Sequence, residues 1–255
     1  MKYNPHNYQK YAIEFIKQHP IAAILLDMGM GKTSIVLSAL NELMYNSFEV
    51  TKILIIAPLR VARNTWSDEI KKWDHLKGLR YSIAVGTATE RKKALAADAD
   101  IFIINRENVQ WLVEQSGVPF DFDMVVIDEL SSFKNWQAKR FKSFMKVRPM
   151  VKRVVGLTGT PSSNGLMDLF AEFKVLDMGE RLGRFIGQYR VNYFNPFCVK
   201  CYEEGHITMA TVVDHIVPHR GDQKLFWDRG NWQPLCEHHH NVKTMTEDRY
   251  VEYKF

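Results

Sequence analysis

The segment LDMGMGKT, which begins at Leu26, carries residues that could bind the phosphates of a nucleotide. It follows an apolar run and opens a helical pattern, so Gly29 and Gly31 would let backbone N–H groups approach a phosphate closely. Lys32 would reach the terminal phosphates, and the Thr33 hydroxyl would bind Mg²⁺. The general phosphate-loop pattern also requires glycine where Leu26 stands, so a chance Gly-Lys-Thr at a strand-to-helix turn is the alternative.

Two adjacent carboxylates, Asp128 and Glu129, end the apolar run MVVID further along the chain. Ligands bind at the carboxyl ends of strands in open α/β sheets. Asp128 could hold Mg²⁺ there, and Glu129 could orient or deprotonate an attacking water. Paired carboxylates on a surface loop are usually only solvated, but a pair that ends a buried strand is expected to have a function.

The third chemical group is a set of cysteines and histidines near the C-terminus. Cys198-x2-Cys201 and Cys236-x2-His239 have the spacing of a four-ligand structural zinc site. Lone cysteines are more often small core residues, but two spaced pairs rarely arise that way. Three histidines in succession, 238 to 240, leave the fourth ligand open, and an odd number of cysteines disfavours a disulfide framework.

The elements that must position these residues follow from the hydrophobic pattern. Short apolar runs alternate with amphipathic stretches, which predicts an α/β fold with a parallel sheet and helices on both sides. An opening helix is expected with Asn4 as its cap and Pro5 in its first turn. The pattern becomes irregular after Asp177, so we expect two domains, 1–195 and 196–255. The apolar runs are 21–26, 53–58, 81–85, 101–105, 124–128 and 153–158.

Composition and charge limit the classes of partner that the chain is expected to bind. The N-terminus has no apolar stretch of signal-peptide length, and the run 21–26 is far shorter than a membrane span, so we expect a soluble, cytoplasmic protein with no membrane partner. Residues 198–255 contain 7 basic and 9 acidic residues, whereas residues 1–197 contain 27 basic and 20 acidic ones. Electrostatic binding of DNA should therefore come mainly from the first domain.

Four segments, DMGMGKT, IIAPLRVARNTWSDEIKKW, VVIDELSSFKN and LTGTPSSNGLMDLF, resemble in this order the first lobe of Swi/Snf-like superfamily 2 helicases and translocases. The resemblance covers residues 3–195 and explains Leu26, because that family has a single glycine before Gly-Lys-Thr. It implies a RecA-like sheet, ATP with Mg²⁺ as cofactors, and DNA as partner. By the same resemblance Gln9 would contact adenine, Thr158 and Thr160 would sense hydrolysis, and Arg60 would lie near the DNA backbone.

The segment departs from the family in two respects. Ser131 stands where the acidic box most often has histidine, although both carboxylates are kept. Nothing after residue 195 resembles the second lobe, which supplies an arginine finger in this family. Such a finger contributes about 10³ to 10⁵ in rate in related phosphoryl-transfer enzymes, so we expect this lobe alone to bind ATP and to hydrolyse it slowly. A separate second lobe would then be a partner.

Three further segments, TVVDHIVPHRGD, FWDRGNWQPLC and HHHNVKTMTED, resemble HNH endonucleases over residues 197–251. The resemblance implies a small zinc-stapled fold of two strands and a helix that holds one divalent metal, Mg²⁺, Mn²⁺ or Ni²⁺. His215 matches the general base, Asp214 and His240 match the metal ligands, and Asn231 matches the residue that pins the loop. The alternative for an isolated His215 is a structural histidine.

Other residues of this segment have less specific interpretations. Thr244 stands where a colicin-like variant of the family has a second metal-binding histidine, which favours Asp214 as the other ligand, with Glu247 as a helper. Phe226, Trp227 and Trp232 could stack on bases, but a small core is the simpler interpretation.

Three functions are consistent with the sequence. The first is an HNH DNA endonuclease fused to an ATP-binding lobe, a combination found in phage and restriction-type systems. The second is a split or truncated helicase ATPase that carries a relic or mobile HNH insertion. The third is a non-enzymatic, ATP-switched DNA-binding protein, against which His215 and Asn231 argue.

Overall fold

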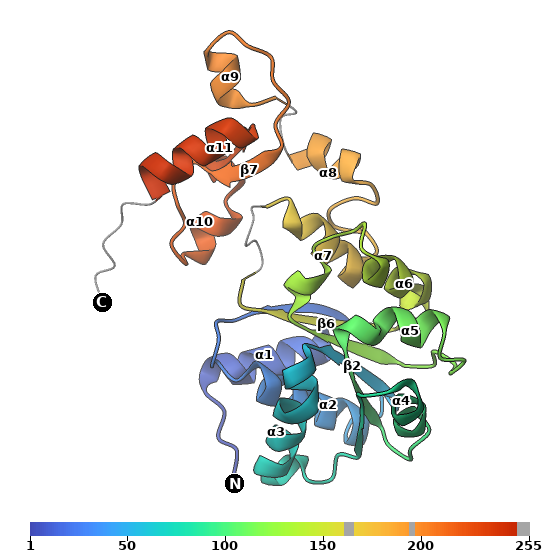
Figure 1. The fold of residues 1–255 in the computed structure, drawn as a ribbon. Coiled ribbons are helices and arrows are strands. Elements are labelled where there is room, and N and C mark those ends of the chain that lie inside the picture. Colours follow the sequence, from blue (N-terminus) through green and yellow to red (C-terminus); the bar gives the residue numbers. More distant parts are fainter. Residues whose placement is uncertain (161–165, 194–196, 249–255) are drawn as a thin grey trace. The chain divides into compact units, whose positions relative to one another are not determined.

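The computed structural model describes residues 1–160, 166–193 and 197–248 (Figure 1). The chain divides into two compact units, which are described separately below. Unit 1 comprises Met1–Pro161 and Ala171–Met178, and unit 2 comprises Ser162–Phe170 and Gly179–Phe255. The chain passes from one unit to the other after residues 161, 170 and 178, whereas the sequence predicted one boundary at residue 195.

Unit 1 is built on a sheet of six strands in the order β1-β6-β5-β2-β4-β3, and every neighbouring pair is parallel. The predicted parallel sheet with flanking helices is confirmed. The strands β2 and β4 are buried along their whole length because both faces of the sheet are covered. The strands are β1 Ile21–Leu25, β2 Ile53–Ala57, β3 Tyr81–Ala84, β4 Ile101–Asn105, β5 Met124–Asp128 and β6 Arg153–Thr158.

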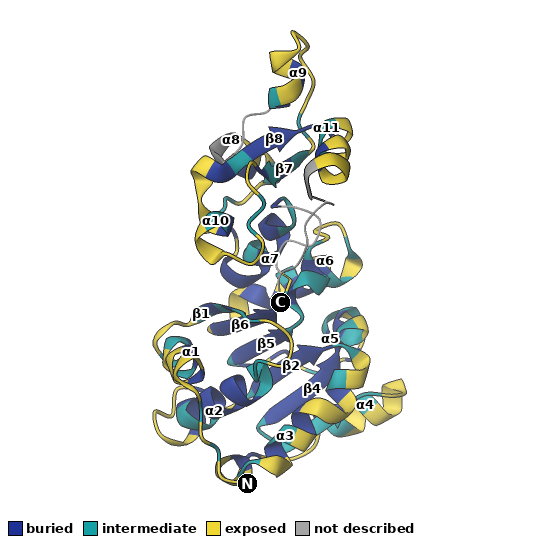
Figure 2. Ribbon diagram, turned by 90° about the vertical axis from the view of Figure 1, so that its left-hand side faces the viewer, coloured by how far each residue is buried: buried dark blue, intermediate teal, exposed yellow. Residues whose placement is uncertain are grey.

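Alternate residues of each strand enter two apolar clusters, one on each face of the sheet. Ile53 and Ile55 pack with the helices before residue 73, whereas Leu54 and Ile56 pack with later helices. Figure 2 shows the sheet strands as the buried layer of this unit. The helices are α1 Asn7–Gln18, α2 Lys32–Tyr45, α3 Trp66–Lys72, α4 Ala88–Leu95, α5 Val109–Glu114, α6 Lys139–Val147 and α7 Asp168–Asp177, of which α7 belongs to this unit from Ala171 onward.

The start of α1 differs from the prediction. Residue His6, not Asn4, precedes the first helical residue, and its backbone N–H donates to Gln9 Oε1 at 2.9 Å. The Gln9 side chain thus satisfies an N–H group at the helix start, which a sequence pattern centred on Pro5 did not reveal. Among the described helices, none is both long enough and apolar enough to cross a membrane.

Unit 2 contains an antiparallel hairpin, β7 and β8, in which His215 pairs with Trp232. Phe226 is buried, in line with the expected core role, but Trp227 is 39% exposed. Tyr189 is also buried, and its hydroxyl donates to the Leu166 carbonyl at 2.8 Å. The elements are α8 Ile186–Tyr193, α9 Val199–Glu203, β7 Val212–His215, α10 Gln223–Trp227, β8 Trp232–Leu235, α11 Glu237–Lys243 and a π-helical turn Thr244–Asp248.

Candidate functional site

The loop between β1 and α2 has the backbone that the glycines were expected to provide. Gly29 and Gly31 have φ values of 80° and 74°, which L side chains rarely adopt. A Cβ atom on Gly31 would also lie 2.5 Å from Gln9 Nε2. Helix α2 starts at Lys32, so the loop delivers the chain to a helix N-terminus, where backbone N–H groups favour anions.

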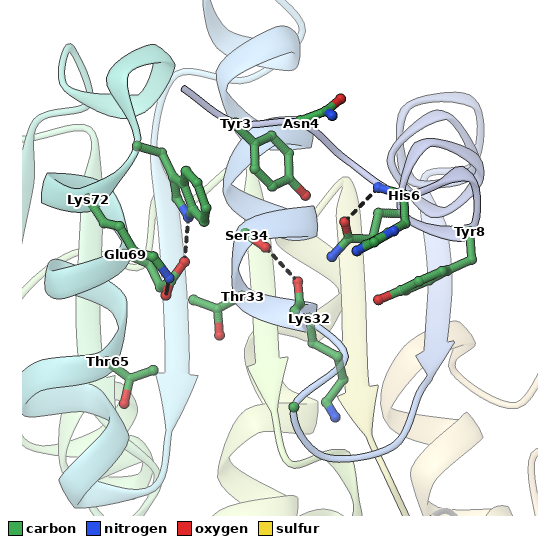
Figure 3. A pocket seen from close by; sticks show the side chains of 14 residues that line it. Tyr3, Asn4, His6, Tyr8, Lys32, Thr33, Ser34, Thr65, Glu69 and Lys72 are labelled. Atoms are coloured by element: carbon green, nitrogen blue, oxygen red, sulfur yellow. Dashed lines mark hydrogen bonds and ion pairs between the residues drawn. The ribbon is translucent and has the colours of Figure 1, made fainter. Parts of the chain in front are cut away.

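A cavity of about 510 Å³ lies beside this loop (Figure 3). Its size is that of a small-molecule site. Lys32 lies at its edge, and the Lys32 Nζ donates to the carbonyl oxygens of Leu26 and Asp27 at 2.7 and 2.9 Å. The side chains that line the cavity include Tyr3, His6, Tyr8, Gln9, Lys32, Thr33, Ser34, Thr65, Glu69 and Trp73.

Gln9 is a buried residue of α1 that lines the cavity and faces the glycine loop. Its Nε2 donates to the Met30 carbonyl at 3.4 Å, and the Tyr8 hydroxyl donates to the same oxygen at 3.2 Å. The start of α1 and the glycine loop therefore form one wall. The contact of Gln9 with adenine stays a prediction.

Asp128 ends β5 and is half-buried. The indole N–H of Trp66, which is fully buried, donates to Asp128 Oδ2 at 3.0 Å. Burial raises the pKa of Asp128 above its usual value, the neighbouring Glu129 charge adds to this, and the Trp66 N–H and the Lys32 charge oppose it. A carboxylate oxygen at the carboxyl end of a parallel strand is a suitable donor for Mg²⁺.

Glu129 follows with a left-handed backbone, φ 64°. This conformation is uncommon for a residue other than glycine and is found disproportionately at functional sites. Its Oε1 accepts hydrogen bonds from Ser131 Oγ at 2.5 Å and Thr158 Oγ1 at 3.0 Å. Ser131, the departure from the common acidic box, thus helps to hold this carboxylate.

The end of β6 connects to Glu129 through Thr158. The Thr160 backbone N–H donates to Thr158 Oγ1 at 3.1 Å, so a chain of hydrogen bonds runs from residue 160 to the acidic box. Residues 161–165 of the same motif lie outside the described part of the chain. Arg60 is exposed and precedes a π-helical turn, Val61–Thr65.

Two residues at this site were not singled out by sequence. Trp66 pairs with a residue 62 positions later, and no local pattern reveals that pairing. Tyr3 lines the cavity, and its buried hydroxyl has no hydrogen-bond partner among the described residues. Burial raises the pKa of Tyr3 above its usual value.

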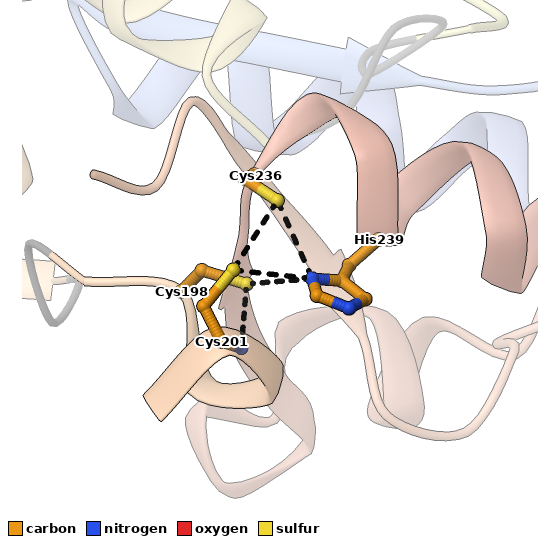
Figure 4. Close-up of side chains that lie close together, drawn as sticks. All are labelled: Cys198, Cys201, Cys236 and His239. Carbon is orange, nitrogen blue, oxygen red and sulfur yellow. Dashed lines mark hydrogen bonds between the residues drawn. The ribbon is translucent and has the colours of Figure 1, made fainter. Parts of the chain in front are cut away.

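In unit 2, Cys198, Cys201, Cys236 and His239 come together (Figure 4). His239 Nδ1 lies 3.4 Å from each of the three Sγ atoms, and the Sγ atoms of Cys201 and Cys236 lie 3.8 Å apart. Zinc–ligand bonds of normal length give tetrahedral edges of about 3.5 to 3.8 Å. The donor set therefore fits Zn²⁺, and His239 is the histidine that joins the three cysteines.

The surroundings of these donors suit a metal site. Cys198 and Cys236 precede the first residues of α9 and α11. Burial of Cys198 raises its pKa, but hydrogen bonds from the backbone N–H groups of Cys201 and Cys236 and from the Cys201 and His239 side chains together lower that pKa to about 6. His239 Nε2 lies 3.2 Å from a Glu204 carboxylate oxygen, the outer contact that usually orients a metal-binding imidazole.

The hairpin places His215 at the end of β7, 8% exposed. Its Nε2 lies 3.0 Å from the Phe226 carbonyl oxygen. A carbonyl can only accept, so Nε2 carries the proton and Nδ1 of a neutral ring is left as the acceptor. This assignment rests on the hydrogen-bond partner.

Asn231 fastens the loop between β7 and α10. Its Oδ1 accepts from the Val217 N–H at 2.7 Å, and its Nδ2 donates to the carbonyls of Val217 and Leu225 at 2.9 and 3.2 Å. The loop that starts just after His215 is thus held from both ends. The role of Asn231 in a nuclease site stays a prediction.

The two expected ligands of a catalytic metal lie on β7 and α11. Asp214 Oδ2 forms an ion pair at 3.0 Å with Lys243, one turn after His240. Within the described residues, the Cys/His set is the one group of three or more His, Cys, Asp or Glu donors close enough to share an ion. A site at Asp214 and His240 would therefore need oxygen donors from water or phosphate. The Glu247 side chain lies outside the described part.

A model of the SNF2-related domain matches residues 8–243. The chain belongs to the SNF2-related family. The match runs past residue 195 and through the Cys/His segment, so membership in the family is not confined to the sheet-containing unit.

Solved SNF2 structures share this fold. The SWI2/SNF2 ATPase core of Sulfolobus solfataricus in complex with dsDNA is 26% identical, with a TM-score of 0.62, over 81% of this chain and 41% of that one. The same core domain without DNA is 25% identical, with a TM-score of 0.57 over 80% of this chain and 40% of that one. The six-stranded sheet is thus the RecA-like sheet of an SNF2 ATPase core.

Curated relatives are longer than this SNF2-related chain. Protein p41 of Acyrthosiphon pisum secondary endosymbiont phage 1 is 33% identical over 94% of this chain and 54% of its own length. The mouse DNA excision repair protein ERCC-6-like is 29% identical over 67% of this chain and 14% of its own length. The chain therefore spans about half of the phage protein. Because that alignment omits only 6% of this chain, it includes Cys198 and Cys236.

Proposed function

We propose that this chain is the ATP-binding first lobe of an SNF2-type DNA translocase or helicase. The observation that carries the proposal is the cavity walled by the glycine loop and lined by Gln9, Lys32 and Thr33, at the carboxyl edge of the sheet. This edge is where ligands bind in open α/β sheets.

The side chains have separate tasks in this proposal. Lys32 and the N–H groups at the start of α2 bind the β- and γ-phosphates, while Thr33 and Asp128 would hold Mg²⁺, which neutralises charge on the phosphates. Glu129, held by Ser131 and Thr158, orients the attacking water. Hydrolysis at a useful rate requires an arginine from a second lobe, on the same polypeptide or on another.

DNA is the proposed macromolecular partner. Residues 1–197 carry the basic excess, and the similar core of Sulfolobus solfataricus was solved with dsDNA. Arg60 lies just before the π-helical turn Val61–Thr65 and Arg63 lies within it. Both side chains are exposed and could bind DNA phosphates. Salt should weaken such binding steeply.

Fluorescence titration with a labelled ATP analogue tests the nucleotide site. We expect saturable binding that Mg²⁺ strengthens, and at least a tenfold loss in Lys32→Ala, because a charged phosphate contact contributes roughly 1.5–3 kcal/mol. Lys77→Ala is the matched control, since Lys77 is exposed and pairs with Asp74 away from the cavity. Equal binding by both variants would contradict the assignment.

The hairpin of unit 2 favours a second function, metal-dependent DNA cleavage of the HNH type. The supporting observation is the bond from His215 Nε2 to the Phe226 carbonyl, which leaves Nδ1 free to take a proton from water. Asp214 and His240 offer one carboxylate and one imidazole, a donor set that suits Mg²⁺ or Mn²⁺. The ion would polarise the phosphodiester and stabilise the leaving oxygen.

Plasmid cleavage with Mg²⁺ or Mn²⁺, with and without ATP, tests the second function. We expect His215→Ala to abolish cutting while nucleotide binding persists, and the exposed His206→Ala to cut normally. Cleavage that survives His215→Ala would exclude His215 as the base. If the two sites act together, Glu129→Gln removes any stimulation of DNA cleavage by ATP. Cleavage that never responds to ATP supports a nuclease whose activity is independent of the ATP-binding lobe.

A further inference from the structure

Trp66 connects the acidic box to a different part of the surface. It is the first residue of α3, is fully buried in the apolar cluster below the sheet, and donates its indole N–H to Asp128 at 3.0 Å. A tryptophan fixed on all sides can hold the carboxylate in one orientation. It also stabilises the ionised form of Asp128, the form that binds a cation, against the effect of burial.

The residues just before Trp66 are mostly exposed to solvent, whereas Trp66 is buried. The turn Val61–Thr65 is π-helical, a form that is rare and occurs frequently at functional sites. Within the turn, Ala62 is buried and its N–H donates to the Pro58 carbonyl at 2.8 Å, and Val61 packs against the same apolar cluster as Trp66. Arg60, just before the turn, and Arg63, within it, are exposed.

One short element therefore carries an exposed basic end and a buried end that touches the acidic box. Thr65, which immediately precedes Trp66, also lines the nucleotide cavity. Because no residue separates the π-helical turn from Trp66, a shift of the turn would also shift the indole.

We propose that Trp66 is a positioning residue that transmits DNA binding at residues 60–65 to Asp128, so that duplex DNA strengthens Mg²⁺-dependent nucleotide binding. The inference rests on the proposed nucleotide site. It assigns the coupling to one hydrogen bond, which can be removed without altering the charged residues at either end.

The test compares Trp66→Phe with Trp111→Phe, a tryptophan that packs on Arg91 away from the cavity. Mg²⁺ is titrated against a fluorescent ATP analogue, with and without a short duplex. Loss of a hydrogen bond to a charged group should raise the Mg²⁺ midpoint about tenfold in Trp66→Phe and remove the effect of DNA. Binding in EDTA should not change, and Trp111→Phe should behave as wild type.

A double-mutant cycle separates positioning from general damage. If Trp66 acts through Asp128, Trp66→Phe should not alter the Mg²⁺ midpoint further in an Asp128→Asn background. Additive effects, or a wild-type midpoint and DNA response in folded Trp66→Phe, overturn the inference. A wild-type chain that binds no nucleotide instead contradicts the proposed function.

Indole NMR keeps the inference testable if Trp66→Phe does not fold. The chain has six tryptophans, so ¹⁵N-labelled protein gives six indole signals. The Trp66 signal should shift when Asp128 becomes Asn and when duplex DNA is added. A Trp66 indole signal that shifts with neither change would overturn the proposed coupling.

Discussion

Lys243 Nζ lies 3.0 Å from Asp214 Oδ2, and the two side chains are only 8% and 16% exposed. The pair joins α11 to β7, the two elements that carry the proposed metal ligands of unit 2. A buried ion pair contributes little net stability against apolar replacements, but removing one member leaves an uncompensated charge. Asp214 therefore depends on a cation at this position.

Lys243→Met should destabilise unit 2 by about 3 kcal/mol, the typical cost of leaving one buried charge without its partner. Urea unfolding measures the loss, and Lys200→Met, at an exposed lysine, should change the midpoint little. In Asp214→Asn the same Lys243 substitution should cost clearly less. An equal loss of stability in both backgrounds would show that the broken ion pair does not cause the destabilisation.

Zinc should be present at one ion per chain and should stabilise unit 2. Cys201→Ser should lose the ion and the structure of unit 2, because structural zinc contributes roughly 10–16 kcal/mol of apparent binding energy. His238→Ala, next to the ligand His239, should keep the ion. Metal analysis and circular dichroism give the readouts, and nucleotide binding by unit 1 should persist. A full zinc content in Cys201→Ser contradicts the site.

Zinc should stay bound to a lower pH than ordinary thiols would allow. Hydrogen bonds in folded unit 2 lower the pKa of Cys198 to about 6, so protons compete less with the ion for this thiolate. A lowered folded-state pKa contributes stability that is present above the ordinary thiol pKa and is lost as the pH falls through about 6. Metal analysis after gel filtration at a series of pH values should therefore show one ion per chain at neutral pH and a loss only as the pH falls through about 6. Loss of zinc already at pH 8 would contradict this.

Gly31→Ala should impair nucleotide binding. At φ 74° a Cβ atom costs about 1–2 kcal/mol, and it would push Gln9 away from the loop. Gly78→Ala is the control, because a Cβ there meets nothing within 4 Å. Thermal unfolding and nucleotide titration measure both effects. Normal affinity in Gly31→Ala would exclude the loop as the phosphate site.

The sheet and the donor clusters were predictable because their signals are local. Apolar runs specify strands, and two Cys/His pairs specify a tetrahedral donor set whatever the chain does between them. The contacts that tune these sites were not predictable. Trp66 meets Asp128, and Lys243 meets Asp214, across separations that no periodicity encodes. The limits of the units could not be predicted either, because residues 166–170 belong to unit 2 although the residues that follow them belong to unit 1.

The left-handed backbone of Glu129 sets the folding stability of the chain against the proposed role of this residue. Such a conformation costs roughly 1–3 kcal/mol in a residue other than glycine, and replacement by glycine or asparagine would recover part of it. Ser131 and Thr158 donate to the carboxylate that such a replacement would remove. A variant stabilised at this position would therefore lose the group that we propose orients the attacking water.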